Sequence, residues 1–78
     1  MSLTDDEKLL IALYERWQET QQLPVNPYAI GDQIGMSTRK VRTILVLLMR
    51  ANFVVKADEE HCTLTSRAVA LAEQLLEE

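Results

Sequence analysis

Apolar residues recur at every third or fourth position near the start of the chain, and this spacing predicts an amphipathic helix over residues 5–20. Leu13 and Trp17 lie on its apolar stripe, one helical turn apart. Thr4 and Glu7 have the spacing of a capping box, in which each side chain binds a backbone N–H at the helix start. We therefore expect a first helix that buries one face, with Trp17 in the core.

A short second helix is predicted over residues 27–34. Asn26 is a favourable N-cap, and Pro27 suits the first helical position because its missing N–H would be unpaired there anyway. Gly35 ends the helix, since glycine adopts the left-handed conformation that other residues avoid. The residues expected to face inward are Tyr28, Ile30 and Ile34.

A third helix is predicted over residues 38–51. Ser37 is its N-cap, and Asn52 is the best non-glycine candidate for a left-handed residue at its end. Apolar positions again recur three and four residues apart, so one face of this helix is expected to pack on the core. The inward residues are Val41, Ile44, Leu45 and Leu48.

The hydrophobic period then changes to that of strands. Residues 53–57 are rich in aromatic and β-branched side chains, a polar tip follows, and a second strand is predicted over 61–65. The two form a β-hairpin with a loop of about three or four residues. Thr65 caps a last helix over 66–77, whose inward residues are Val69, Ala72, Leu75 and Leu76.

This order of elements is that of a winged helix-turn-helix. Gly31 stands where the two helices of the turn touch and a small residue is needed, and Gly35 makes the turn four residues later. Met36 and Val41 supply apolar contacts between the helices. The expected fold is therefore mainly α (α+β): three helices, a two-stranded β-hairpin wing and a C-terminal helix. The alternative is a helical bundle in which residues 53–65 are disordered.

Residues 28–45 resemble the helix-turn-helix of winged-helix transcriptional regulators, most closely the MarR-type group. Residues 48–54 are similar to the Leu-x-x-x-Gly-Leu-Val/Ile passage into the wing, with Asn52 in place of the usual glycine. Residues 64–68 are similar to the Leu-Thr-x-Lys-Gly that leaves it. The resemblance covers roughly residues 8–76, and it implies that the third helix enters the DNA major groove with the hairpin beside it.

The length and the charge of the chain limit the functions that the protein can have. The 78 residues are about half an ordinary domain, so we expect one domain over residues 1–78 and exclude large cofactor-binding folds. The net charge of −4, taken whole, argues against nucleic acid. However, residues 1–35 carry two basic and six acidic side chains, residues 36–56 five basic and no acidic ones, and residues 57–78 one basic and six acidic ones. An acidic chain thus contains one basic band, centred on the third helix.

The outward face of the third helix is basic and hydroxylic. At about 100° per residue, Arg39, Thr43 and Arg50 point away from the core, with Lys40 and Arg42 on either side. Arginine can bind guanine in bidentate fashion, threonine can contact a thymine methyl, and lysine can bind phosphate. The residues expected to contact DNA are Thr38, Arg39, Lys40, Arg42, Thr43, Arg50 and Lys56.

These features predict sequence-specific binding to double-stranded DNA by a small prokaryotic or phage transcriptional regulator. Tight binding by so small a module would favour a homodimer on two half-sites. The alternative is a winged-helix protein-protein interaction module that does not bind nucleic acid. This alternative would explain the acidic wing tip at residues 58–60, and the apolar Val46 and Leu47, which have no evident core to face.

Catalysis and metal binding are not expected. His61 and Cys62 are adjacent on a predicted strand, so their side chains point to opposite faces and do not readily share one metal. No spaced nucleophile or glycine-rich phosphate loop accompanies the single histidine, so we expect no enzyme, metal or cofactor. A lone cysteine forms no internal disulfide, the N-terminus is acidic, and no apolar run approaches the roughly 18 residues of a membrane span. We expect a cytoplasmic protein without a membrane partner.

Overall fold

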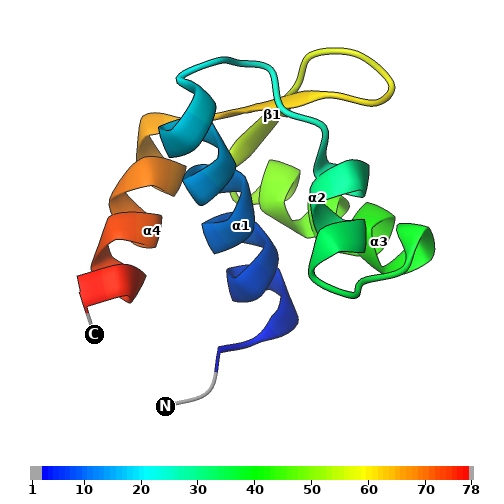
Figure 1. Cartoon of the computed structure of the whole chain (residues 1–78), viewed down its shortest axis with the longest axis horizontal. Helices are drawn as coiled ribbons and strands as arrows, with labels where there is room; N and C mark the ends of the chain where they lie inside the picture. The colour runs from blue at the N-terminus through cyan, green and yellow to red at the C-terminus, as the bar shows by residue number, and fades with distance from the viewer. Residues whose placement is uncertain (1–2, 78) are drawn as a thin grey trace.

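The computed structural model describes residues 3–77, which form four α-helices and a two-stranded antiparallel hairpin (Figure 1). Their bounds are α1 (Asp5–Thr20), α2 (Pro27–Gln33), α3 (Thr38–Arg50), β1 (Val54–Lys56), β2 (Cys62–Leu64) and α4 (Ser66–Glu77). The arrangement is a winged helix, which confirms the predicted fold class. Because residues 53–65 form an ordered hairpin, the alternative of a helical bundle with a disordered segment is wrong.

Helix α1 is the central element of the fold. It packs against α2, α3 and α4, and Figure 1 shows it between α4 on one side and the α2–α3 pair on the other. The predicted capping box is present: the Glu7 N–H donates to the Thr4 hydroxyl at 3.4 Å, and the Thr4 N–H donates to the Glu7 carboxylate at 2.9 Å. Leu9 and Leu13 are fully buried. The first helix is therefore the scaffold on which the helix-turn-helix is mounted.

The crossing of α2 and α3 is as close as the sequence predicts. A Cβ atom added at Gly31 would lie 2.3 Å from a methyl carbon of Val41, so only glycine fits there without movement. Gly35 has a φ of 82°, which makes the turn between the helices. The Met36 N–H then donates to the Gly31 carbonyl at 2.8 Å. These contacts fix the orientation of α3 on the rest of the fold.

The hairpin is tied to the segment between α1 and α2, residues 21–26. Val25 forms an isolated antiparallel bridge with Cys62, through two backbone hydrogen bonds of 2.8 and 2.9 Å. At the base of the hairpin, the Thr65 hydroxyl donates to the Asn52 carbonyl at 2.6 Å and accepts from the Ala68 N–H at 3.2 Å. The hairpin is thus held at both its edge and its base.

A few details differ from the sequence-based expectations. Helices α2 and α3 each end one residue earlier than predicted, at Gln33 and Arg50. Ile34 and Leu76 were expected to face inward, and both are exposed, at 44% and 49%. Ile34 is the C-cap of α2, where the backbone leaves the helix, so it does not continue the inward stripe. Leu76 lies in the last turn of α4, beyond the small residues Ala68 and Ala72 that are buried.

Candidate functional site

The orientation of α3 is set by its buried stripe. Ser37 caps the helix by accepting a hydrogen bond of 3.2 Å from the Lys40 N–H. The four apolar residues expected to face inward are all buried, namely Val41, Ile44, Leu45 and Leu48. The opposite side of the helix is therefore presented to solvent. Its exposed residues include Arg39, Thr43, Val46 and Arg50.

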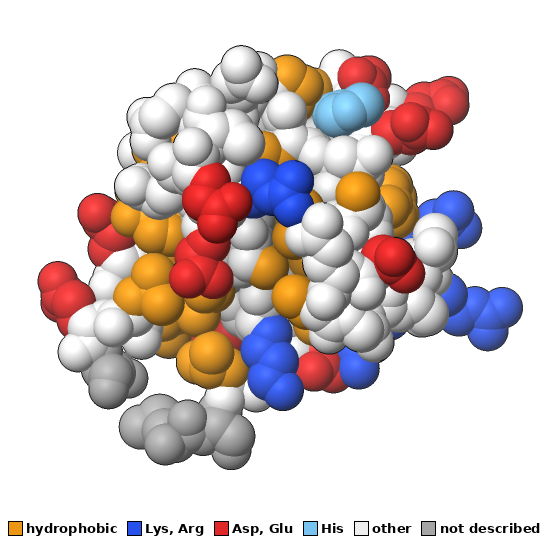
Figure 2. Space-filling model, viewed as in Figure 1, with side chains coloured by type: hydrophobic (Ala, Val, Ile, Leu, Met, Phe, Trp, Pro, Cys, Tyr) orange, Lys and Arg blue, Asp and Glu red, His pale blue; other side chains and the backbone are white. Residues whose placement is uncertain are grey.

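All seven residues that the sequence predicts as DNA contacts are exposed. Six of them lie on α3, and Lys56 is the last residue of β1. Among residues 3–77, the ion pairs within 4.0 Å are Lys40 with Asp5 and His61 with Asp58. The charges of Arg39, Arg42, Arg50 and Lys56 are therefore not neutralised within the described part of the chain. In Figure 2, blue basic side chains stand out along the right-hand edge, where α3 lies.

One edge of this basic surface is bordered by acids from α1. The Lys40 ammonium forms an ion pair with Asp5, and both side chains are about half exposed. Lys40 lowers the pKa of the Asp5 carboxyl, chiefly through this hydrogen bond. Asp5 and Asp6 also line a shallow hollow with Arg39 and Thr43. Lys40 is thus engaged by α1, unlike the other cations of α3.

The other edge is a groove of about 400 Å³ between α3 and the hairpin. Leu45, Met49 and Val54 give it an apolar lining. Tyr28 of α2 also lies along it, although the sequence marks this residue only as an inward position. No sequence motif distinguishes Tyr28 from an ordinary core residue, and its role in the groove follows from the packing of α2 beside the hairpin tip.

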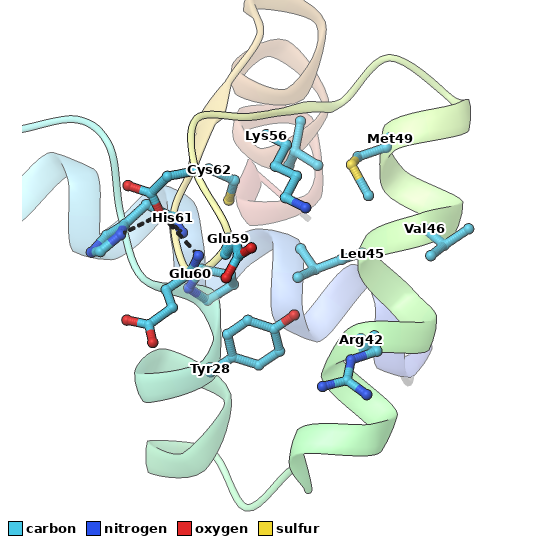
Figure 3. Close-up of a pocket in the computed structure, with 13 residues that line it drawn as sticks. Tyr28, Arg42, Leu45, Val46, Met49, Lys56, Glu59, Glu60, His61 and Cys62 are labelled. Atoms are coloured by element: carbon cyan, nitrogen blue, oxygen red, sulfur yellow. Dashed lines mark hydrogen bonds and ion pairs between the residues drawn. The ribbon is translucent and has the colours of Figure 1, made fainter.

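Charged side chains of both signs surround the groove (Figure 3). Arg42 and Lys56 are the cations, and Glu59 and Glu60 come from the tip of the hairpin. In Figure 3, Arg42 extends from α3 on one side and the two glutamates lie on the other, with Tyr28 between them. The acidic wing tip therefore faces one of the predicted DNA contacts.

The backbone of the wing tip is fixed by a carboxylate. Asp58 accepts hydrogen bonds from the N–H groups of Glu60 and His61, each at 2.8 Å. Its carboxylate also lies 2.9 Å from Nδ1 of His61. These contacts, led by the His61 side chain, lower the pKa of Asp58. Asp58 is thus engaged within the loop, while Glu59 and Glu60 remain exposed at its tip.

The structure offers little support for a reactive cysteine or a metal site. Burial raises the pKa of the Cys62 thiol to about 11, which disfavours the reactive thiolate. Within residues 3–77, no group of three His, Cys, Asp or Glu side chains is placed to hold a metal ion. No helix of the described chain is long and apolar enough to span a membrane.

Comparison with known proteins supports the architecture. No protein-family profile matches the chain, and no curated protein matches it. A crystal structure of a "putative DNA-binding protein" from Ralstonia eutropha JMP134 matches with a TM-score of 0.74 and 26% sequence identity. The match covers 95% of this chain and 98% of that one. The two proteins therefore share their fold over nearly their whole lengths, while the finer resemblance to MarR-type regulators stays a prediction.

Proposed function

We propose that this protein binds double-stranded DNA through α3. The observation that carries the proposal is the exposed row of Arg39, Arg42 and Arg50 on a helix that has no acidic residue. None of the three guanidinium groups is in an ion pair within residues 3–77, so each is available to an anionic ligand. The name of the structural relative, which shares 26% of its residues with this chain, supports the same ligand.

We assign these residues to two kinds of contact with DNA, to base edges and to phosphates. Arg39 and Thr43 lie on the outward face of α3, one turn apart, and are the residues we assign to base edges in the major groove. Arg50 and Lys56 lie farther along the chain and are assigned to phosphates, which position the protein without reading sequence. Thr38 and Arg42 complete the surface. Lys40 contributes less, because its charge is already paired with Asp5.

In its finer form, the proposal is a sequence-specific prokaryotic or phage transcriptional regulator without enzymatic activity. One recognition helix of 13 residues offers a small interface, so a homodimer on two half-sites would raise both affinity and specificity. Selection of preferred duplexes from a random-sequence library tests the sequence specificity. Sedimentation equilibrium tests the dimer, and a strict monomer on DNA would remove that part of the proposal.

The proposal is tested by removing two arginines of α3. Arg39→Ala with Arg42→Ala should weaken binding to a mixed-sequence duplex by at least about tenfold at roughly 50 mM salt. Lys8→Ala with Arg16→Ala is the control, since it removes the same charge from α1 and keeps alanine in a helix. It also removes the hydrogen bond of 2.6 Å from Arg16 to Gln33, so thermal unfolding is used to verify that the control variant is folded. An equal loss of affinity in both variants would show that only the net charge matters. Absence of duplex binding by the wild-type protein would overturn the proposal.

A protein-interaction module is the second candidate. Val46 and Leu47 are exposed at 39% and 51% beside the basic row, and apolar side chains in such a position suit a protein partner. The acidic wing tip also opposes DNA phosphates. The two candidates differ in the binding measurement just described, because a protein-interaction module binds no duplex even at low salt.

A further inference from the structure

Two glutamates of the wing tip lie beside the DNA-binding surface proposed above. Glu59 and Glu60 line the groove between α3 and the hairpin together with Arg42. The same three residues also line a neighbouring hollow of about 380 Å³, to which Thr38 contributes. Neither glutamate is in an ion pair within the described range of the chain. The two glutamates therefore lie at the same groove as Arg42 without forming an ion pair with it.

The backbone that carries these glutamates is held in place. The Ala57 and Asp58 N–H groups donate to the His61 carbonyl at 2.9 and 3.2 Å. The Asp58 carboxylate in turn accepts hydrogen bonds from the N–H groups of Glu60 and His61. The bridge between Val25 and Cys62 anchors the strand that follows. Because the tip is fixed, its charges stay at the groove and the hollow that Arg42 also lines. Salt screens such charges only over about 10 Å at 0.1 M, so neighbouring charges still act on one another.

We propose that Glu59 and Glu60 weaken the attraction of Arg42 for DNA phosphates and so limit the sequence-independent affinity of the protein. This inference rests on the proposed DNA binding. A phosphate that approaches Arg42 also approaches the two carboxylates, and the repulsion offsets part of the gain. Arg39 and Thr43 line neither the groove nor the hollow that holds Glu59 and Glu60, so these two glutamates do not oppose their contacts to base edges. The acids that share a hollow with Arg39 and Thr43 are Asp5, which is paired with Lys40, and Asp6.

The consequence concerns where the protein resides on DNA. Non-specific sites vastly outnumber specific ones, and phosphate attraction supplies essentially all of the affinity for them. A wing with this charge therefore keeps the protein off arbitrary duplex. The tip of the hairpin acts here as a repulsive element beside α3, while Lys56 at the end of β1 remains a phosphate contact.

The test is a double-mutant cycle on a mixed-sequence duplex. Glu59→Gln with Glu60→Gln should raise affinity by about tenfold at roughly 50 mM salt, because two repulsive charges are removed. In an Arg42→Ala background the same pair of changes should raise affinity by only about twofold, since Arg42 no longer draws a phosphate beside the two carboxylates. Glu15→Gln with Glu19→Gln is the control. It changes the charge equally on α1, in a hollow that no α3 or hairpin residue lines.

Each outcome decides the matter. The inference is supported if affinity rises in the Glu59→Gln and Glu60→Gln variant but not in the α1 control, and if most of this rise disappears in the Arg42→Ala background. An equal gain in the α1 control, an undiminished gain in the Arg42→Ala background, or no gain at all would overturn it while leaving the proposed function intact. Absence of wild-type binding at low salt is a separate result, because it overturns the proposed function itself.

Discussion

The close approach of α2 to α3 depends on the missing side chain of Gly31. A methyl group there would overlap a methyl of Val41, which is fully buried and, as a β-branched residue in a helix, has one strongly preferred rotamer. To relieve the overlap, Val41 must leave that rotamer or one helix must move. A single residue thus controls how α3 is presented to its ligand.

Gly31→Ala should destabilise the protein by about 1 kcal/mol, because the steric cost exceeds the gain in helix propensity. In a Val41→Ala background the same change should stabilise by about 0.5 kcal/mol, since the overlapping methyl is gone and only the propensity gain remains. Urea unfolding of the four proteins measures both values. A Gly31→Ala effect of the same sign and size in both backgrounds would contradict this account of the crossing.

The thiol of Cys62 should be unreactive in the folded protein. Its residue is 4% exposed, and burial raises its pKa to about 11, so little thiolate is present at pH 8. Alkylation followed by mass spectrometry should be slow in buffer and fast in denaturant. Equally rapid alkylation in both conditions would show that the strand β2 opens readily.

Several single residues could be predicted because their roles are local. Gly35 and Asn52 both have positive φ, as their positions at helix ends indicate. The caps at Ser37 and Thr65 are likewise present. Tyr28 could not be assigned to the groove, because that position depends on a hairpin that lies more than 20 residues later in the chain.

At the scale of elements, two surface carboxylates hold parts of the chain in place, one between two helices and one within a loop. Asp5 joins α1 to α3 through Lys40, and Asp58 orders the tip of the hairpin. Both have a lowered pKa in the folded state, so their ionised forms favour folding. Their contribution is fully present above the unfolded pKa of about 3.9 and is lost as the pH falls through the lower folded value.

Stability should therefore fall as the pH drops below about 4, and Asp5→Asn with Asp58→Asn should make this fall shallower. Thermal unfolding between pH 7 and pH 2.5 measures the dependence. Asp32→Asn is the control, since Asp32 is in no ion pair within residues 3–77. An unchanged pH dependence in the double variant would show that neither contact contributes to folding.

The sequence predicted the type and order of the elements but not all of their pairings. Periodicity and caps locate helices because these signals lie within a few residues of one another. The bridge between Val25 and Cys62 joins residues far apart in the chain, and no local pattern indicates it. The placement of Glu59 and Glu60 opposite Arg42 follows from such long-range packing, so it required the structure.

For the whole molecule, the distribution of charge matters more than the total of −4. The basic band predicted from the sequence lies on the exposed side of α3. Asp5 and Asp6 border it on one edge, and Glu59 and Glu60 on the other. A narrow cationic surface between acidic borders favours one orientation of an anionic ligand, because other orientations bring phosphates against carboxylates.

The most direct test of the central claim is the salt dependence of duplex binding by the wild-type protein. Four cations that are in no ion pair within residues 3–77 are available to DNA: Arg39, Arg42, Arg50 and Lys56. If two to four phosphates are contacted, log affinity should fall linearly with log salt, with a slope between about −2 and −4. The Arg39→Ala and Arg42→Ala pair should make that slope shallower. A flat dependence, or no binding at roughly 50 mM salt, would contradict DNA binding by α3.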